Sequence, residues 1–241
     1  MIKRQIPNLI TLGNLMCGVE SLFASLVTGD VCLAAIWICA GIFLDFFDGL
    51  AARLLGVASP LGKELDSLAD VVTSGIAPSF IMFRLVEEPL KEMLPLWAVI
   101  LIMLPFVLMP AFAAYRLAKF NIDTRQSHSF LGLPVPANAL IWVGLALAGF
   151  IVNNLPLAII LAVVAMFTDI LMISEMPMFS LKFNFKDMSW KTNAVQYLFI
   201  GGCAALIVVT LITIGFSWSV LSLIIFWYIL LSIITQRRHA E

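Results

Sequence analysis

The sequence predicts an all-α fold, a polytopic transmembrane bundle of about eight helices. Its mean hydropathy is +1.05 and only 12% of its residues are charged, against about 25% in soluble domains. Its apolar runs are each roughly 20 residues long, enough to cross a hydrocarbon core of about 30 Å. The net charge of −1 gives no field that would attract nucleic acid, so we expect no nucleic-acid partner.

The apolar runs place the elements along one catalytic domain spanning residues 1–241. After a basic lead-in over residues 1–5, we expect membrane helices at about residues 10–28, 31–55, 62–86, 94–119, 134–152, 157–173, 194–216 and 219–235. Polar links are expected at residues 87–92, 120–131 and 174–191, and the region 192–241 adds two C-terminal helices.

Basic residues predict the orientation. If the N-terminus is cytoplasmic, all of the 14 lysines and arginines except Arg84 and Lys91 fall on the cytoplasmic side. We therefore expect an integral, multi-pass protein of the cytoplasmic membrane with both termini in the cytoplasm.

Four carboxylates stand at the margins of the second and third apolar runs, on the same predicted cytoplasmic side. Asp45 and Asp48 are three residues apart and Asp66 and Asp70 four, so each pair shares one helix face. The short link between the two helices makes them antiparallel neighbours, and the pairs can converge. Such a cluster needs cations, and oxygen ligands suit Mg²⁺ or Mn²⁺. Two such ions can clamp the attacking and leaving oxygens of a phosphoryl displacement.

Neighbouring residues fit a phosphate ligand. Gly49 and Gly62 lack side chains and allow a backbone or a phosphate to come close, and Arg53 lies one turn beyond Gly49. Asn8, Thr11 and Asn14 share a face of the first helix that suits a nucleotide or phosphate wall, or else hydrogen bonds between helices. An alternative is that the acids form ion pairs or a cation path, although Arg53 and Lys63 can pair only two of them.

The spacing of aspartates, glycines, Ala52 and Arg53 between Asp45 and Asp70 resembles the signature of the CDP-alcohol phosphatidyltransferase family. The resemblance implies a helical bundle, usually a homodimer, that moves a phosphatidyl group from a CDP-linked donor to an alcohol at a two-metal site and releases CMP. It also implies metal-ligand roles for all four aspartates, a general-base role for Asp70, and contacts of Ala52, Gly49 and Arg53 with the cytidine diphosphate. The matching positions are Asp45-x2-Asp48-Gly49-x2-Ala52-Arg53-x8-Gly62-x3-Asp66-x3-Asp70.

Stretches outside the signature resemble membrane-integral phosphatidylserine synthases, which implies CDP-diacylglycerol and L-serine as substrates. Serine carries a carboxylate, so its pocket needs a cation. Arg116 or Lys119 is the candidate, with Asn121 beside them, although both cations also fit ordinary residues at the membrane interface. Lys119 stands where the resemblance leads us to expect arginine. The stretches are residues 6–14, 116–121 and 130–137, followed by 171–174 and Lys182.

Two other functions remain open from the sequence. The acceptor of the same reaction can be glycerol 3-phosphate or inositol phosphate, whose phosphate groups call for a more basic pocket. A divalent-cation transporter can use the same acids, but they cluster at one membrane face instead of crossing the bundle, and Arg53 stands among them.

Overall fold

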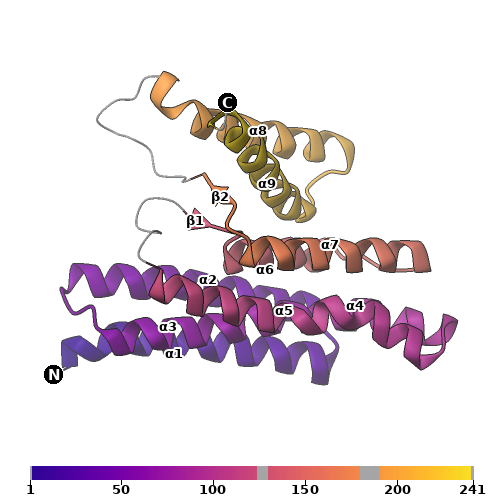
Figure 1. The fold of residues 1–241 in the computed structure, drawn as a ribbon. Helices are drawn as coiled ribbons and strands as arrows, with labels where there is room; N and C mark the ends of the chain where they lie inside the picture. Colours follow the sequence, from indigo (N-terminus) through magenta and orange to yellow (C-terminus); the bar gives the residue numbers. More distant parts are fainter. Residues whose placement is uncertain (1, 124–129, 180–189, 240–241) are drawn as a thin grey trace.

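The computed structural model describes residues 2–123, 130–179 and 190–239 of the chain as a bundle of helices (Figure 1). Figure 1 shows the N-terminus and the α2–α3 link at one end of the bundle, and the α1–α2 and α4–α5 turns at the other. The α-helices are α1 (Ile2–Phe23), α2 (Val31–Leu54), α3 (Pro60–Asp70), α4 (Ala77–Met93), α5 (Leu96–Ile122), α6 (Val135–Leu147), α7 (Leu155–Ile173), α8 (Trp190–Thr213) and α9 (Ser219–His239). Two π-helical turns are η1 (Ala24–Thr28) and η2 (Val71–Ile76).

The predicted all-α membrane bundle is confirmed. Six helical stretches of the described chain are long and apolar enough to cross a membrane, and two apolar helices are shorter. One of these is α6, which we expected over residues 134–152. It ends at Leu147, and Gly149 follows with a φ of 66°. Its 13 residues extend only about 20 Å, less than the thickness of the hydrocarbon core.

Two predicted boundaries are wrong. The basic lead-in over residues 1–5 is not a separate element, because α1 already begins at Ile2 and continues through Pro7. The polar link expected at residues 87–92 lies inside α4, where Lys91 Nζ is 2.6 Å from Glu87 Oε1 one turn earlier. Charged pairs at this spacing stabilise a helix, so the polar residues extend α4 instead of ending it.

The start of α3 sets how the two acid-bearing helices meet. Ser59 Oγ accepts a hydrogen bond from the Gly62 amide at 3.1 Å, and Pro60 occupies the first turn. A capping serine followed by proline is a strong helix start. The chain therefore reverses within residues 55–59, and α3 returns alongside α1.

Close contact between α1, α2 and the π-turn η2 fixes the depth of the acids. A Cβ on Gly18 would stand 2.9 Å from Thr73 Cα, and one on Gly41 would stand 2.8 Å from Asn14 Oδ1. Thr73 Oγ1 donates to the Asn14 carbonyl at 2.9 Å across this contact. The missing side chains let η2 lie against both helices directly below Asp70.

A short antiparallel strand pair joins the ends of α5 and α7, in segments that we expected to be loops. Strand β1 (Phe130–Leu131) pairs with β2 (Pro177–Met178). The Leu133 amide donates to the Leu171 carbonyl at 3.1 Å, so the segment before α6 is tied to the end of α7.

The last two helices form a hairpin beyond α6 and α7 (Figure 1). Helix α9 packs along α6, where Ser222 Oγ donates to the Ile141 carbonyl at 2.6 Å. Helix α8 packs on α9 and is otherwise mostly exposed. That residues 1–241 form a single catalytic domain stays a prediction.

Candidate active site

A pocket of about 300 Å³ opens at the end of the bundle where α3 begins. That volume is at the lower end of the range for small-molecule sites. All six residues that we expected to bind the CDP-linked donor line it: Asn8, Thr11, Gly49, Ala52, Arg53 and Gly62. The remaining lining residues also come from α1, α2, α3 and the α2–α3 link, so the pocket belongs to the first three helices: Pro7, Asp48, Val57, Ala58, Ser59, Lys63 and Asp66.

Three of the four predicted metal ligands converge beside this pocket, and two of them, Asp48 and Asp66, line it. Asp45, Asp48 and Asp66 each offer a carboxylate oxygen, and these oxygens lie within 4.8 Å of one another. Asp66 Oδ1 is buried and has no hydrogen-bond partner among the described residues. An orphaned oxygen in an oxygen-only cluster fits a hard divalent cation. The cluster can therefore hold a metal.

The first helix holds two of the acids in place. Thr11 Oγ1 donates to Asp48 Oδ2 at 2.5 Å, and Asn14 Nδ2 donates to Asp70 Oδ1 at 3.2 Å. The sequence left open whether the polar face of this helix borders the nucleotide or makes hydrogen bonds between helices. Thr11 lines the pocket as expected, but Asn14 is turned to Asp70. Three-residue spacing on one helix gives both contacts, since it places the side chains on one face.

Asp70 lies one turn deeper than Asp66 and is not part of the convergent trio. Only 7% of the surface of Asp70 is exposed. Because it lies outside the pocket lining, Asp70 borders the trio from the interior of the bundle. The structure thus separates an outer group of three carboxylates from an inner one.

The two signature glycines have different surroundings. A Cβ on Gly62 would approach Asn8 Oδ1 and Ser59 Oγ, each at 3.3 Å, so this glycine allows α3 to lie close to α1. A Cβ on Gly49 would meet only Arg53 Nη2, at 4.0 Å. Helix packing does not require a glycine there. Its missing side chain leaves space inside the pocket, as a closely approaching ligand would need.

Two cations face the pocket. Arg53 Nε donates to the Gly49 carbonyl at 3.0 Å, which holds the guanidinium along the wall. Lys63 also lines the pocket, and its Nζ donates to the Asn121 carbonyl at 2.7 Å. We had not expected Lys63 to be a donor-site residue. Its position directly after Gly62 was the available signal.

Arg116 comes from α5 on the other side of Asp70. Arg116 is 7% exposed, and in the part of the chain that the structure describes its buried Nε has no hydrogen-bond partner. The guanidinium carbon lies 5.4 Å from the centre of the Phe120 ring, and the group is within electrostatic reach of Asp70. A buried arginine with an unused donor can bind an anionic group.

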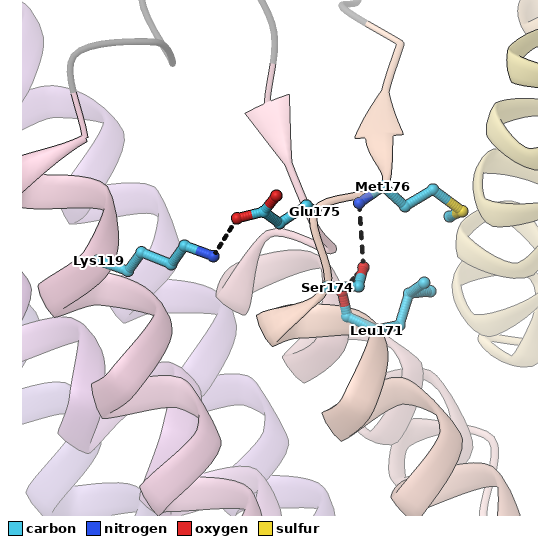
Figure 2. A network of polar contacts seen from close by, with 5 residues as sticks. All are labelled: Lys119, Leu171, Ser174, Glu175 and Met176. Carbon is cyan, nitrogen blue, oxygen red and sulfur yellow. Dashed lines mark hydrogen bonds and ion pairs between the residues drawn. The ribbon is translucent and has the colours of Figure 1, made fainter. Parts of the chain in front are cut away.

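Lys119 and Asn121, the other residues proposed for serine, have different partners. Figure 2 shows Lys119 pointing to Glu175, with Nζ 3.2 Å from Oε1, just after the end of α7. Asn121 Nδ2 donates to Ser67 Oγ at 2.9 Å and so ties α5 to α3. The structure therefore does not gather the three residues at one point.

One further acid lies inside the membrane region. Asp169 on α7 is fully buried, and neither of its oxygens has a hydrogen-bond partner among the described residues. It is not a lining residue of the pocket.

Comparison with known families places this arrangement in a class. The family model described as CDP-alcohol phosphatidyltransferase matches residues 4–171, which include the pocket and all four aspartates. The chain belongs to the CDP-alcohol phosphatidyltransferase family.

Three relatives are each named CDP-diacylglycerol–serine O-phosphatidyltransferase. The protein of Bacillus subtilis (strain 168) is 38% identical over 160 residues, covering 64% of this chain and 80% of the relative. The Helicobacter pylori (strain J99) protein is 38% identical over 140 residues, covering 57% and 55%. The Saccharomyces cerevisiae protein is 34% identical over 138 residues, covering 52% and 46%. The match thus spans about half the length of the last two.

The carboxylate trio makes a prediction about metal binding. Asp66→Asn removes a charge from the convergent oxygens, and we expect Mn²⁺ affinity of the purified protein to fall about 10-fold to 100-fold. Titration followed by Mn²⁺ electron paramagnetic resonance measures the affinity without any turnover. Asp30→Asn is the matched control, because Asp30 caps the opposite end of α2 and asparagine also caps well. Equal affinity in both variants would remove Asp66 from the metal site.

Proposed function

We propose that this protein is a phosphatidylserine synthase. It would transfer the phosphatidyl group of CDP-diacylglycerol to the hydroxyl of L-serine and release CMP. The observation that carries the proposal is the pocket in which every predicted donor-binding residue meets a convergent trio of carboxylates. The shared name of the relatives supports serine as the acceptor.

The CDP portion of the donor would occupy the pocket between α1, α2 and α3. Arg53 and Lys63 bring positive charge to the wall, where the pyrophosphate needs it. Gly49 leaves room for the nucleotide to lie against α2. Asn8 adds an amide for a hydrogen bond to the base or a phosphate oxygen.

Asp45, Asp48 and Asp66 would hold the metal, and Asp70 would add a fourth carboxylate from the inner side. We propose Mg²⁺ or Mn²⁺, with two ions in the complete site, because all donors are carboxylate oxygens. A bound divalent cation neutralises the pyrophosphate and favours attack at the phosphatidyl phosphorus.

Asp70 would act as the general base. The serine hydroxyl gives its proton to Asp70 while its oxygen forms the new bond to the phosphatidyl phosphorus. The bond from that phosphorus to the CMP oxygen breaks, and CMP leaves. Asn14 supports this role, because its hydrogen bond to Oδ1 fixes the orientation of the carboxylate.

Serine would enter on the α5 side, where Arg116 would bind its carboxylate. We assign this role to Arg116 in preference to Lys119, since Glu175 already pairs with Lys119. One available cation suits the single carboxylate of serine better than the phosphate of glycerol 3-phosphate or inositol phosphate. The pairing of Lys119 with Glu175 therefore favours serine over those acceptors.

We further propose that the pocket opens to the cytoplasm and that the protein acts as a homodimer. The basic residues of the sequence support the orientation, since Lys3, Arg53 and Lys63 belong to the end of the bundle that holds the pocket. The family resemblance supports the homodimer.

The test is CMP release from CDP-diacylglycerol by detergent-purified protein with Mn²⁺ or Mg²⁺. We compare L-serine, glycerol 3-phosphate and inositol phosphate as acceptors. Release that depends on serine and stops with a chelator supports the proposal. Release with only another acceptor overturns serine and keeps the metal site, whereas metal uptake into proteoliposomes without lipid substrate points to a transporter.

Replacing the proposed base tests its role directly. Asp70→Asn should lower kcat about 10²-fold to 10⁴-fold, because no group remains to take the proton. Binding of CDP-diacylglycerol, measured by ligand-induced thermal stabilisation, should change little, since Asp70 is outside the donor pocket. A kcat within twofold of the Asp30→Asn control would exclude Asp70 as the base.

Separate substitutions of the two cations test the acceptor assignment. Arg116→Ala should raise the KM for serine about 10-fold or more with little change in the KM for CDP-diacylglycerol, because it removes a charged hydrogen-bond donor. Lys119→Ala should change the serine KM less. A larger effect of Lys119→Ala, or an equal effect on both substrates, would contradict the assignment of Arg116.

A further inference from the structure

Helix α5 contacts the segment that carries the proposed base at two levels. At the inner level, a Cβ on Gly75 of η2 would stand 2.9 Å from Ala113 Cβ, so η2 and α5 touch there. At the outer level, Asn121 Nδ2 donates a hydrogen bond to Ser67 Oγ at 2.9 Å. The inner contact is close packing, whereas the outer contact depends on a side-chain hydrogen bond.

The outer level also includes a bond from the donor pocket. Lys63, in the first turn of α3, donates from Nζ to the Asn121 carbonyl at 2.7 Å. This bond uses the backbone of Asn121, so a change of the Asn121 side chain removes the bond to Ser67 and keeps the acceptor of the Lys63 bond. The contribution of the bond to Ser67 can therefore be measured by itself.

The two contacts are equally spaced on both segments. Ser67 and Gly75 are eight positions apart, and so are Ala113 and Asn121. The later residue of α5 meets the earlier residue of α3, so the two segments run antiparallel and in register. The contacts therefore bound a section of about two helical turns on each side.

Asp70 and Arg116 both lie in this section. Asp70 is three residues after Ser67, and Arg116 is three residues after Ala113. Residues three apart share a helix face, so each of these side chains is on the face that makes the contact. Because the segments are antiparallel, the two residues lie within about one helical turn of each other in depth. The contacts thus place the proposed base opposite the buried arginine.

The separation of these two groups is critical in the proposed reaction. Asp70 would take the proton of the acceptor hydroxyl while Arg116 would hold the acceptor carboxylate, so one small molecule must reach both. Proton transfer requires hydrogen-bond reach, and a misplacement of about 1 Å can lower the rate about 10²-fold. The inner contact fixes the separation at one end of the section, and the bond from Asn121 fixes it at the other.

We propose that Asn121 is a positioning residue, which holds Arg116 at a fixed distance from Asp70 through its hydrogen bond to Ser67. In this role it acts on the acceptor through Arg116 and does not bind the acceptor itself. Neither Asn121 nor Ser67 lines the donor pocket, so the effect is confined to the acceptor. The inference rests on the proposed function for the roles of Asp70 and Arg116.

The experiment compares Asn121→Leu with the wild type and with Asn153→Leu. Leucine has nearly the size of asparagine and cannot form the hydrogen bond. Asn153 is the matched control, because it also makes a side-chain hydrogen bond, from Asn154 at 2.8 Å, in the link between α6 and α7. We expect Asn121→Leu to lower kcat/KM for serine about fivefold to 20-fold. The KM for CDP-diacylglycerol and the melting temperature in detergent should match those of the control.

Two further variants isolate the hydrogen bond. Ser67→Ala removes the same bond from the other side, so the double variant with Asn121→Leu should be no slower than the slower single variant. Asn121→Asp should restore most of kcat/KM, since its carboxylate can accept a hydrogen bond from the Ser67 hydroxyl.

Three results would overturn the inference. A kcat/KM for serine equal to that of Asn153→Leu shows that the bond does not position the acceptor side. A parallel loss of melting temperature and of the affinities for both substrates shows a structural role only. Multiplicative effects of Asn121→Leu and Ser67→Ala show that the two residues act independently.

The proposed function is judged separately by the wild type. If the wild type releases CMP with another alcohol and not with serine, serine is wrong as the acceptor. The same comparison, made with the alcohol that is used, then decides the role of Asn121. If no alcohol supports CMP release, the proposed function fails, and the inference that rests on it fails too.

Discussion

Mutual repulsion among carboxylates within an apolar bundle is the constraint on which the site depends. Asp45, Asp48 and Asp66 place oxygens within 4.8 Å of one another, where charges interact more strongly than in water. Within the described ranges, no lysine or arginine forms an ion pair with them. A divalent cation would supply the positive charge that offsets this repulsion. On α1, Thr11 donates a hydrogen bond to Asp48 and Asn14 donates one to Asp70. The oxygens of the trio that face one another remain available to a metal.

The bundle is divided between the two substrates of the proposed reaction. The first three helices supply every residue of the donor pocket, and they lie within the part of the chain that the family model matches. The proposed acceptor side would comprise α5, which carries Arg116, and the segment after α7 that is paired to α5 through Lys119 and Glu175. Asp70 stands between these halves, held by Asn14 from one side and facing Arg116 on the other. A change of acceptor within such a fold would require changes on only one side of the base.

Close backbone packing keeps Asp70, the proposed base, at its depth. The π-turn η2 begins directly after Asp70 and lies against α1 and α2 at Gly18 and Gly41. π-Helical turns often occur at functional sites. Here the turn carries Thr73, whose hydroxyl binds the carbonyl of Asn14, the same residue whose side chain binds Asp70. The orientation of the carboxylate is therefore coupled to the packing of three helices.

The sequence by itself determined the helical membrane class and the chemical type of the site. Long apolar runs admit only helices in a bilayer, and the three- and four-residue spacing of Asp45, Asp48, Asp66 and Asp70 placed each pair on one face. It also selected six of the residues that line the proposed donor pocket: Gly49, Ala52, Arg53 and Gly62 lie within a few turns of the acids, whereas Asn8 and Thr11 lie on the first helix. Boundaries were less certain: the charged residues before Met93 extend α4 through a local ion pair, and α6 is too short to span the core. Only the tertiary structure separated Asp70 from the trio, joined Asn14 to Asp70 and gave Lys119 its partner Glu175. Those contacts join residues 56 or more positions apart, and helix periodicity describes neighbours along one helix but not which distant helix each face will meet.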